Sequence, residues 1–464
     1  MQRGFQRGSV LSRESQPPPE ARVSTADETA AQFVAWVRGA APYVHAFRNK
    51  TFVIAFGGEV VADHDRAQRF AYDCNLLAAL GIRLVLVHGA RPQIDAEMAR
   101  RGLEPQFHHG LRVTDAAALE CVKSAMSVTR VEVEALLSQG LPNTPMAGAH
   151  IRVTGGNFIT ARPVGVVDGV DYQFTGAVRK IIDDEICADL DQQNVVLITP
   201  LGLSPAGEIF NLSMEDVAEA VAVALKAEKL VYLCDAPGLL DEDGRVIESV
   251  TGDQAQRMFD AGEGLTEDLH LYLPGAVRAV RKGVGRVHLI DHDKDGGLLL
   301  EFFTHAGVGT IVTRDPLFRM REATFDDVGA LVALITPMEA DGSLVRRGRE
   351  LLEQEVERFT LVEHDGVLVG CAALYPFGDE GSAELACLAV AHDYRRAGLG
   401  DQLLRRLERR ARAMGLSRLF ILTTRTAHWF RERGFVEAGP DMLPRQKREL
   451  YNYQRRSKVF VKSL

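Results

Sequence analysis

The chain has 464 residues, roughly three times the length of a typical domain, so we expect two domains or three. Apolar residues make up 46% of the chain and charged residues 25%, the composition of an ordinary globular protein. With 54 basic and 63 acidic residues the net charge is −9, which argues against a nucleic acid as the main partner. No run approaches the ~18 consecutive apolar residues that a membrane helix needs.

The beginning of the chain and its cysteines carry weak signals. Residues 1–25 have no apolar period and contain a Pro triplet, so we expect a disordered extension, with a transit peptide as the less favoured alternative. The six cysteines are scattered and form no C-x-x-C pair. This pattern indicates a reducing compartment, which we expect to be the cytoplasm, and it predicts neither structural zinc nor another metal.

Residues 26–312 have the pattern of an α/β domain. The segment 31–47 carries a helical apolar stripe. Strand-like apolar runs then alternate with helical segments, at 51–58 (which ends in a Gly pair), 82–89, 195–200 and 229–234. This alternation predicts a mainly parallel sheet with helices on both faces, in three αβα layers.

The pattern changes after a charged break with an Asp-Pro pair, which we interpret as a linker at residues 313–319. Residues 320–464 predict a second, α+β domain. It begins with a hairpin at 357–377 that turns at Asp365-Gly366. A strand at 383–390, a basic helix from 401, another strand, a short helix and a strand-like tail follow.

A glycine-containing loop, RRAGLG (395–400), lies between a strand and a helix predicted to begin near Asp401. A pyrophosphate group needs several backbone N–H donors that converge from a loop without obstructing side chains. Gly398 and Gly400 permit this approach, the helix start adds its positive dipole end, and Arg395 and Arg396 add charge. We therefore favour a phosphate-binding loop over an ordinary turn.

This R-x-x-G-x-G order between a strand and a helix resembles the acetyl-CoA loop of the GNAT acetyltransferases. The resemblance implies acetyl-CoA as the co-substrate. It also implies that the strand at 386–390, with Leu388 and Val390, offers backbone N–H groups to pantetheine. That strand should part from the strand at 419–424 and leave a wedge for the thioester.

The second domain more specifically resembles bacterial N-acetylglutamate synthases. The similar segments are GSLVRRGRE, CAALYPF, ELACLAV, LTTRTAHWFRERGF and YNYQRRSKVF, which span most of residues 320–464. The resemblance implies acetyl transfer from acetyl-CoA to the α-amino group of L-glutamate, the first step of arginine biosynthesis.

The proposed reaction needs a general base, because an ammonium must lose a proton before its nitrogen attacks a thioester. Glu384, at the entry of the apolar strand, is the candidate, acting through a water. Many GNAT enzymes carry a Tyr general acid where this chain has Phe430, so Thr423 or a water becomes the candidate acid.

Bidentate Arg is the natural partner for each of glutamate's two carboxylates. The resemblance points to Arg347, Arg455 and Ser457 as substrate-binding residues. It adds Leu422, and Cys387 as a contact in the wedge and not as a nucleophile.

The first domain resembles the amino-acid kinase fold, specifically N-acetylglutamate kinase. The similar segments are AFGGE (55–59), VHGARPQ (87–93), TGGNF (154–158), NLSMED (211–216), LYLPGAVRAV (271–280) and the segment 287–310. Kinases of this family have lysines where this chain has Ala55 and, nearby, Gly275. Because phosphoryl transfer depends on such cations, we expect no kinase activity.

In arginine-sensitive members of this family the segment near 282–310 helps to bind L-arginine. The resemblance therefore makes Glu301 the candidate guanidinium acceptor, with carbonyls around Gly307 and Gly309 completing the site, although a Glu satisfied by local backbone is the alternative. The same proteins interlace their N-terminal helices into a hexameric ring, which makes Phe33 and Trp36 candidate oligomer contacts.

Together the two resemblances imply an N-acetylglutamate synthase that arginine inhibits through a dead kinase domain. Three alternatives stay open. One is a bifunctional synthase–kinase or an acetylglutamate kinase. The others are an arginine-sensing scaffold without catalysis and a GNAT enzyme that acts on another amine.

Overall fold

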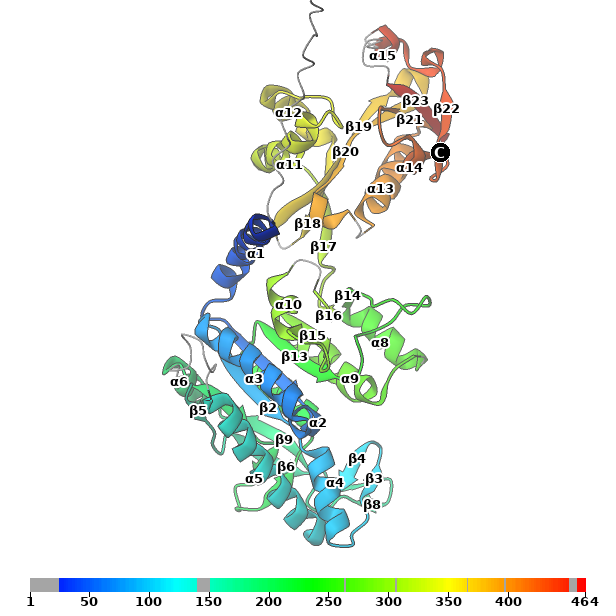
Figure 1. Ribbon diagram of the computed structural model, residues 1–464. Coiled ribbons are helices and arrows are strands. Elements are labelled where there is room, and N and C mark those ends of the chain that lie inside the picture. The colour runs from blue at the N-terminus through cyan, green and yellow to red at the C-terminus, as the bar shows by residue number, and fades with distance from the viewer. Residues whose placement is uncertain are drawn as a thin grey trace, which may run out of the picture.

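The computed structural model describes residues 25–139, 151–262, 264–304, 307–364, 366–395, 398–449 and 457–464. Figure 1 shows two folded halves, each built around its own sheet. The extension predicted at residues 1–25 lies outside the described residues except for its last residue. None of the helices in the described ranges has the length and apolar character that a bilayer crossing requires.

The first half contains an eight-stranded sheet with the order β14-β16-β15-β13-β1-β2-β10-β5. In this order the strands span Ser249–Thr251, Thr310–Thr313, Arg286–Asp291, Lys229–Cys234, Thr51–Phe56, Arg83–His88, Val195–Ile198 and Val153–Thr154. Every neighbouring pair is parallel except β15 and β16. The predicted mainly parallel sheet is therefore confirmed.

Helices cover both faces of this sheet because its strands are apolar on both sides. On β1, Val53 and Ala55 face a core formed with α6 (Asp183–Asp191), α7 (Met214–Ala224), α8 (Gly252–Ala261) and α9 (Glu267–Arg281). Phe52, Ile54 and Phe56 face the opposite core, formed with α1 (Thr25–Phe47), α3 (His64–Ala79), α5 (Ala116–Ser138) and α10 (Gly297–Phe303). The remaining helices of this half are α2 (Gly58–Ala62) and α4 (Arg91–Arg100).

Smaller sheets complete the first half. One has the order β12-β11-β6-β9, with strands Ile209–Asn211, Leu201–Leu203, Ile159–Pro163 and Gly176–Ile181. Two hairpins are formed by β3 (Gln106–His108) with β4 (Leu111–Val113) and by β7 (Val166–Val167) with β8 (Val170–Asp171).

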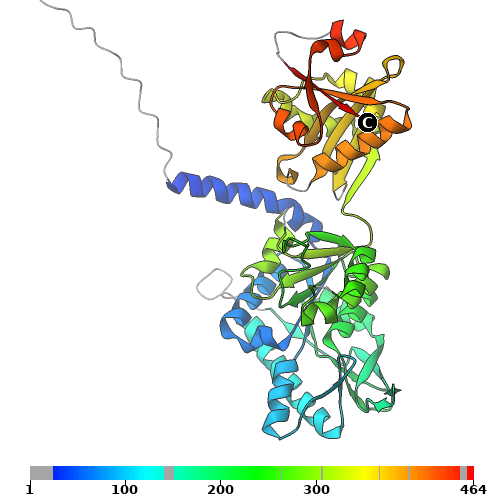
Figure 2. The ribbon, with the colours of Figure 1, turned by 90° about the vertical axis from the view of Figure 1, so that its right-hand side faces the viewer.

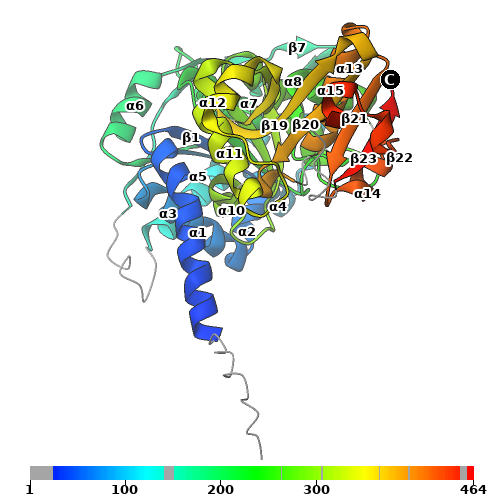
Figure 3. The same ribbon diagram turned by 90° about the horizontal axis from the view of Figure 1, so that it is seen from above.

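Helix α1 extends away from both halves, as Figures 2 and 3 show. Its last turns pack Tyr43, Val44 and Phe47 onto the first half. Further toward its start, Phe33 is 65% exposed and Trp36 is 52% exposed. The helix thus carries large apolar side chains that this chain leaves uncovered.

The second half is a seven-stranded sheet with the order β17-β18-β19-β20-β21-β23-β22. The strands span Phe318–Glu322, Phe359–His364, Val367–Phe377, Ser382–Val390, Arg418–Thr423, Lys458–Ser463 and Val436–Ala438. Helix α13 (Leu399–Ala413) packs on one face, and α11 (Val328–Ala340) and α12 (Arg349–Glu355) pack on the other. The short helices α14 (Ala427–Arg431) and α15 (Arg445–Glu449) lie near the carboxyl end.

The predicted linker is shorter in the structure. β16 ends at Thr313 and β17 begins at Phe318, inside the break that we expected at 313–319. The charged residues of β17 hide its pattern, because β17 is an edge strand that pairs only with β18 and therefore needs no apolar period.

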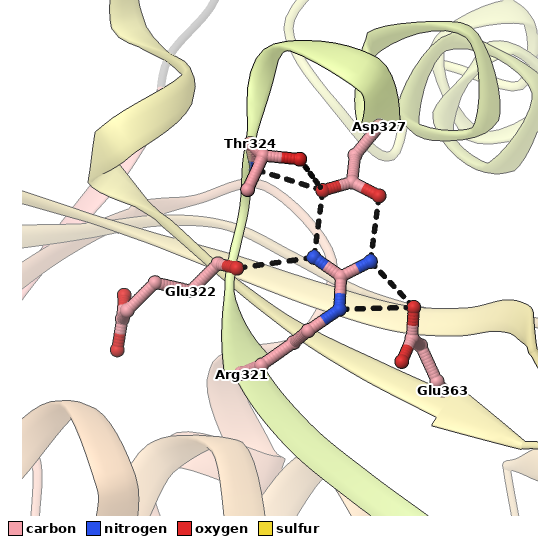
Figure 4. A network of polar contacts seen from close by, with 5 residues as sticks. All are labelled: Arg321, Glu322, Thr324, Asp327 and Glu363. Carbon is pink, nitrogen blue, oxygen red and sulfur yellow. Dashed lines mark hydrogen bonds and ion pairs between the residues drawn. The ribbon is translucent and has the colours of Figure 1, made fainter.

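The entry to the second half is fixed by one arginine, shown in Figure 4. Arg321 on β17 donates a bidentate pair to Asp327, at 2.7 and 2.6 Å, and also donates to Glu363 at 3.0 Å. The backbone N–H and the hydroxyl of Thr324 donate to the same Asp327 carboxylate. The Arg321 hydrogen bonds lower the pKa of Asp327 well below its usual value.

We expect Arg321→Met to lower the free energy of unfolding of the second half by about 2–3 kcal/mol at neutral pH, because Asp327 and Glu363 would lose their shared cation. A carboxylate with a lowered pKa stabilises the fold above its unfolded pKa, and that contribution is lost as the pH falls. The difference between variant and wild type should therefore shrink below pH about 4. Urea unfolding at several pH values measures it.

Arg314→Met is the control, because Arg314 pairs with Asp315 on an exposed surface and should contribute less than about 1 kcal/mol. Equal losses in the two variants would contradict the role given to the Arg321 network.

Candidate active site

The centre of the second sheet opens into a wedge. β20 and β21 are parallel, and they pair only through Ser382–Glu384 and Arg418–Phe420. Beyond Glu384, β20 continues along β19, whereas β21 continues along β23. The backbone groups of residues 385–390 that face β21 therefore have no partner strand among the described residues. The parting that the resemblance implied is confirmed.

A bulge in β20 lies at the mouth of this wedge. Cys387 has φ 51°, in the left-handed region that non-glycine residues avoid, and the register against β19 shifts beside it. Such a bulge turns the backbone groups of a strand in a new direction. Its unfavourable backbone conformation persists only where the surrounding structure fixes it. Past the bulge, Leu388 and Val390 pack on the side of α13. Both predicted pantetheine contacts thus lie on the unpaired stretch.

The glycine loop leads from this stretch into α13. Gly398 has φ 65° and caps the helix, which begins at Leu399, two residues earlier than predicted. The N–H groups of the first turn have no acceptor within the helix, so they are available to an anion. Arg395 is exposed beside them. Arg396 lies outside the described residues.

The other two predicted loop residues have packing roles. A Cβ on Gly400 would come within 3.2 Å of the Trp429 ring. The carboxylate of Asp401 accepts two hydrogen bonds from Arg433, at 2.5 and 3.0 Å, and the Arg433 guanidinium stacks 3.9 Å from the Trp429 ring centre. Because its carboxylate is engaged, Asp401 can serve a phosphate only through its backbone N–H.

Three predicted residues meet on the face covered by α11 and α12. Arg347 comes from the loop between those helices, which is fixed by a 2.7 Å hydrogen bond from the Arg347 N–H to Glu339. Burial acts to lower the pKa of Arg347, but Cys387, Tyr375 and Glu384 lie close enough to raise it above its ordinary value. The guanidinium donates to the carbonyl oxygen of Val345 at 3.2 Å.

Glu384, the proposed base, is 6% exposed. Across the sheet it lies between Tyr375 of β19 and Phe420 of β21. Its Oε2 atom lies 2.7 Å from Nζ of Lys447, in an ion pair whose angles do not make a hydrogen bond. Lys447 is not predicted from the sequence, since no pattern marks one basic residue in the RQKRE segment.

The Cys387 thiol is also buried, at 5% exposure. A contact with the thiol of Cys371 lowers its pKa, burial raises it, and Arg347 lowers it further. A thiol enclosed in this way suits a contact role better than covalent catalysis.

The remaining substrate-side residues lie along β21 and β23. Thr423 ends β21, where its hydroxyl accepts the Thr426 N–H at 3.1 Å and shares a 2.8 Å hydrogen bond with the Thr426 hydroxyl. Leu422 packs beside the cluster of Phe420, Leu443 and Val459. Ser457 directly precedes β23, and Arg455 lies outside the described residues.

Phe430, at the position where many GNAT enzymes carry a Tyr, is 6% exposed and packs edge-on against Trp429 and Phe435. Its ring belongs to the core and offers no proton. Thr423 or a water therefore stays the candidate general acid.

The first half retains a cavity of about 120 Å³ where the kinase motifs meet. Its lining includes Gly58, Gly89, Glu215 and Asp268. Burial raises the pKa of Glu215 to about 7 and that of Asp268 to about 6. The described lining residues hold two arginines but no lysine. Such an acidic cavity is poorly suited to a nucleoside triphosphate.

The predicted effector residues form a closed cluster. Glu301 accepts 2.7 and 3.1 Å hydrogen bonds from the N–H groups of Val308 and Gly309, and His288 Nδ1 lies 2.6 Å from its other oxygen. On its far side, His288 faces Lys229 at 3.1 Å. Burial opposes the charge of Glu301, but the hydrogen bonds from His288 and the loop outweigh it and hold its pKa low.

Gly307 and Gly309 fit this cluster closely. Gly307 has φ 59°, and a Cβ there would lie 2.7 Å from Glu301 Oε2, while one on Gly309 would lie 2.2 Å from a backbone oxygen. In this arrangement Glu301 supports the loop, so a guanidinium would have to displace existing hydrogen bonds. Its effector role stays a prediction.

Comparison with known proteins identifies both halves. The amino acid kinase family matches residues 50–291, and the acetyltransferase (GNAT) family matches residues 330–435. An amino-acid acetyltransferase of Ralstonia nicotianae is 53% identical over 93% of this chain and 96% of its own. The chain belongs to the amino-acid acetyltransferase family.

Other members of this family agree. The amino-acid acetyltransferase of Azotobacter vinelandii is 52% identical over 93% of this chain and 99% of its own. The N-acetylglutamate synthase of Neisseria gonorrhoeae, solved with coenzyme A and L-arginine, covers 93% of this chain and 99% of its own at a TM-score of 0.80 and 38% identity. Its structure with coenzyme A and N-acetyl-glutamate has a TM-score of 0.60 at 39% identity. The predicted fold class and the predicted acyltransferase activity are confirmed.

Gly398→Val tests the acetyl-CoA loop of this acetyltransferase. A branched residue at a left-handed φ should distort the loop and raise the KM for acetyl-CoA by about tenfold or more, with little change in the KM for the amino acid. Initial-rate kinetics measures both. Gly415→Val is the matched control, because Gly415 has φ 75° at the other end of α13. Equal rises in both variants would contradict the assignment.

Proposed function

We propose that this acetyltransferase transfers the acetyl group of acetyl-CoA to the α-amino group of L-glutamate, the first step of arginine biosynthesis. One observation carries the proposal: Glu384 lies where β20 and β21 part, the glycine loop follows the unpaired end of β20, and Arg347 lies near Glu384. The thioester and an anionic amino acid can therefore meet at a carboxylate base.

The residues fit acetyl-CoA as the donor. The unpaired edge of β20 can hydrogen-bond the amides of pantetheine, and the loop with the first turn of α13 can bind its pyrophosphate. Glu384 accepts a proton from the substrate ammonium, through a water. The amine nitrogen then forms a C–N bond with the thioester carbonyl, and the C–S bond breaks.

The thiolate that leaves needs a proton. We assign it to Thr423 or to a water. The amide N–H of Thr426 donates to the Thr423 oxygen, and the two hydroxyls share a hydrogen bond in which either can be the donor. The Thr423 proton is available to the thiolate when the Thr426 hydroxyl is the donor.

For the substrate we propose Arg347, Arg455 and Ser457 as readers of the two carboxylates, with Cys387 and Leu422 as contacts. Arg347 is the member supported by electrostatics, because the charges of Cys387 and Glu384 act to raise the pKa of its guanidinium. A basic pocket disfavours a cationic acceptor such as a polyamine.

The first half we propose to be regulatory, with L-arginine as an inhibitor. The crystal structure of the gonococcal relative with L-arginine supports a site in proteins of this kind. Inhibition at a distance requires arginine to bind one state of the protein more tightly than another.

We also propose a homo-oligomer, specifically a hexamer, and a cytoplasmic location. The exposed Phe33 and Trp36 of α1 support an oligomer, since a second copy would cover them. Six free cysteines support a reducing compartment. The domain boundaries 26–312 and 320–464 are likewise proposed, with the linker expected at 313–319 reduced to the residues between the end of β16 and the start of β17.

Thiol release from acetyl-CoA, screened over the common amino acids, tests the function. We expect L-glutamate to be acetylated and L-glutamine to be acetylated at least tenfold less efficiently, because a neutral amide cannot pair with a guanidinium. ADP release from ATP with N-acetylglutamate should stay at background, because Ala55 and Gly275 supply no cation. Equal use of glutamine, or ADP release, would contradict the proposal and favour another GNAT substrate or the bifunctional alternative.

Glu384→Gln should lower kcat by about 100-fold or more while the protein stays folded, as removal of a general base does. Glu408→Gln is the control, because Glu408 is a buried carboxylate of the same half that pairs with Lys462, away from the wedge. Steady-state kinetics compares them. Wild-type turnover in the Glu384 variant would remove the base assignment.

A further inference from the structure

The environment of Glu384 contains a cation that the proposed reaction does not use. Lys447 Nζ lies 2.7 Å from Glu384 Oε2, while the carboxylate side chain is 8% exposed and the lysine side chain 31% exposed. A carboxylate buried to this degree is costly unless a charge or hydrogen bonds compensate it. Lys447 supplies that charge at contact distance.

Lys447 is brought there by long-range packing. Helix α15 follows Leu443, which is 2% exposed and packs with Phe420 and Val459 of the neighbouring strands. The first N–H of α15, from Arg445, donates to Glu380 at 2.9 Å, just before β20. The helix is therefore anchored at two points beside the carboxylate.

Other charged or titratable groups surround Glu384 without this contact. They are Arg347 with Glu339 from α11 and the loop after it, Tyr375 of β19 with Glu355 of α12 behind it, and Cys387 on β20 itself. Tyr375 donates its hydroxyl hydrogen to Glu355 at 2.7 Å and lies beside Arg347. Arg347 is thus shared among several groups, whereas Lys447 faces Glu384 directly.

We propose that Lys447 is a positioning residue for the base: it holds the Glu384 carboxylate in its buried place, where the carboxylate takes the substrate's proton. The inference rests on the proposed function of Glu384. The positive charge at 2.7 Å offsets the cost of burying the carboxylate and fixes the position of its Oε2 atom. The same charge disfavours the ammonium form of a bound amino acid, so it eases the release of a proton from the reacting nitrogen.

Both effects act on the chemical step. Lys447→Met should lower kcat for L-glutamate at pH 7 by about tenfold, with little change in the KM for either substrate. Lys447→Arg, which keeps the charge, should restore kcat to within about threefold of the wild-type value. The full-length protein is used throughout, with acetyl-CoA saturating.

Lys462→Met is the matched control. Lys462 pairs with buried Glu408 in the same half, and its side chain has an exposure similar to that of Lys447. The Lys462 variant therefore removes an equivalent ion pair away from Glu384. This control should leave kcat at the wild-type value, even if both variants lose similar stability in urea. A double variant with Glu384→Gln should show no further change on loss of Lys447, because the lysine acts through that carboxylate.

Two results would overturn the inference. One is wild-type kcat and KM in Lys447→Met. The other is a raised KM for glutamate with kcat unchanged, which would make Lys447 a substrate contact. Failure of the proposed function is distinguishable, since it shows as wild-type turnover in Glu384→Gln whatever the lysine variants do.

Discussion

The parting of β20 from β21 is the constraint on which the active half depends. Two parallel strands in the middle of a sheet normally satisfy each other's backbone groups along their whole length. Here the pairing stops at Glu384, and the bulge at Cys387 turns the next residues away from regular geometry. Both strands stay fixed because each keeps an antiparallel neighbour on its outer side. The sheet can therefore leave backbone donors unpaired for a ligand without losing its core.

The same opening brings charges into a buried place. Glu384 lies at the last paired position, so it is held by the sheet on one side and borders the wedge on the other. The charge of Glu384 is compensated from outside the sheet, by Lys447 on α15. Arg347 belongs to the loop before α12. A substrate that adds two carboxylates and an ammonium enters a site whose charges are already set, so little reorganisation is needed.

A feature of this protein can be predicted from its sequence when one continuous segment encodes it. The strands, α13 and the glycine loop are each continuous segments, and the absence of a hydroxyl at Phe430 is visible in one residue. Lys447 could not be found, because its place beside Glu384 depends on the packing of Leu443 and on the anchor at Glu380. Glu301 shows the same limit, since only the structure reveals that His288 and the loop at 308–309 already occupy its oxygens. β17 could not be predicted from the sequence, because an edge strand needs no apolar period.

The kinase-like half shows why its glycine motifs say little about phosphoryl transfer. A Cβ on Gly89 would lie 3.2 Å from the Cα atom of Gly57, and one on Gly155 would lie 2.8 Å from the carbonyl oxygen of Leu197. These glycines are required by strand ends that pass close together, whether or not a phosphate is ever bound. At the positions of Ala55 and Gly275 this chain has no cation: Ala55 is buried in the core, and a Cβ on Gly275 would lie 3.0 Å from the Tyr232 hydroxyl oxygen. Phosphoryl transfer depends on such cations. In a fold of this kind the cations, and not the glycines, separate a kinase from a scaffold.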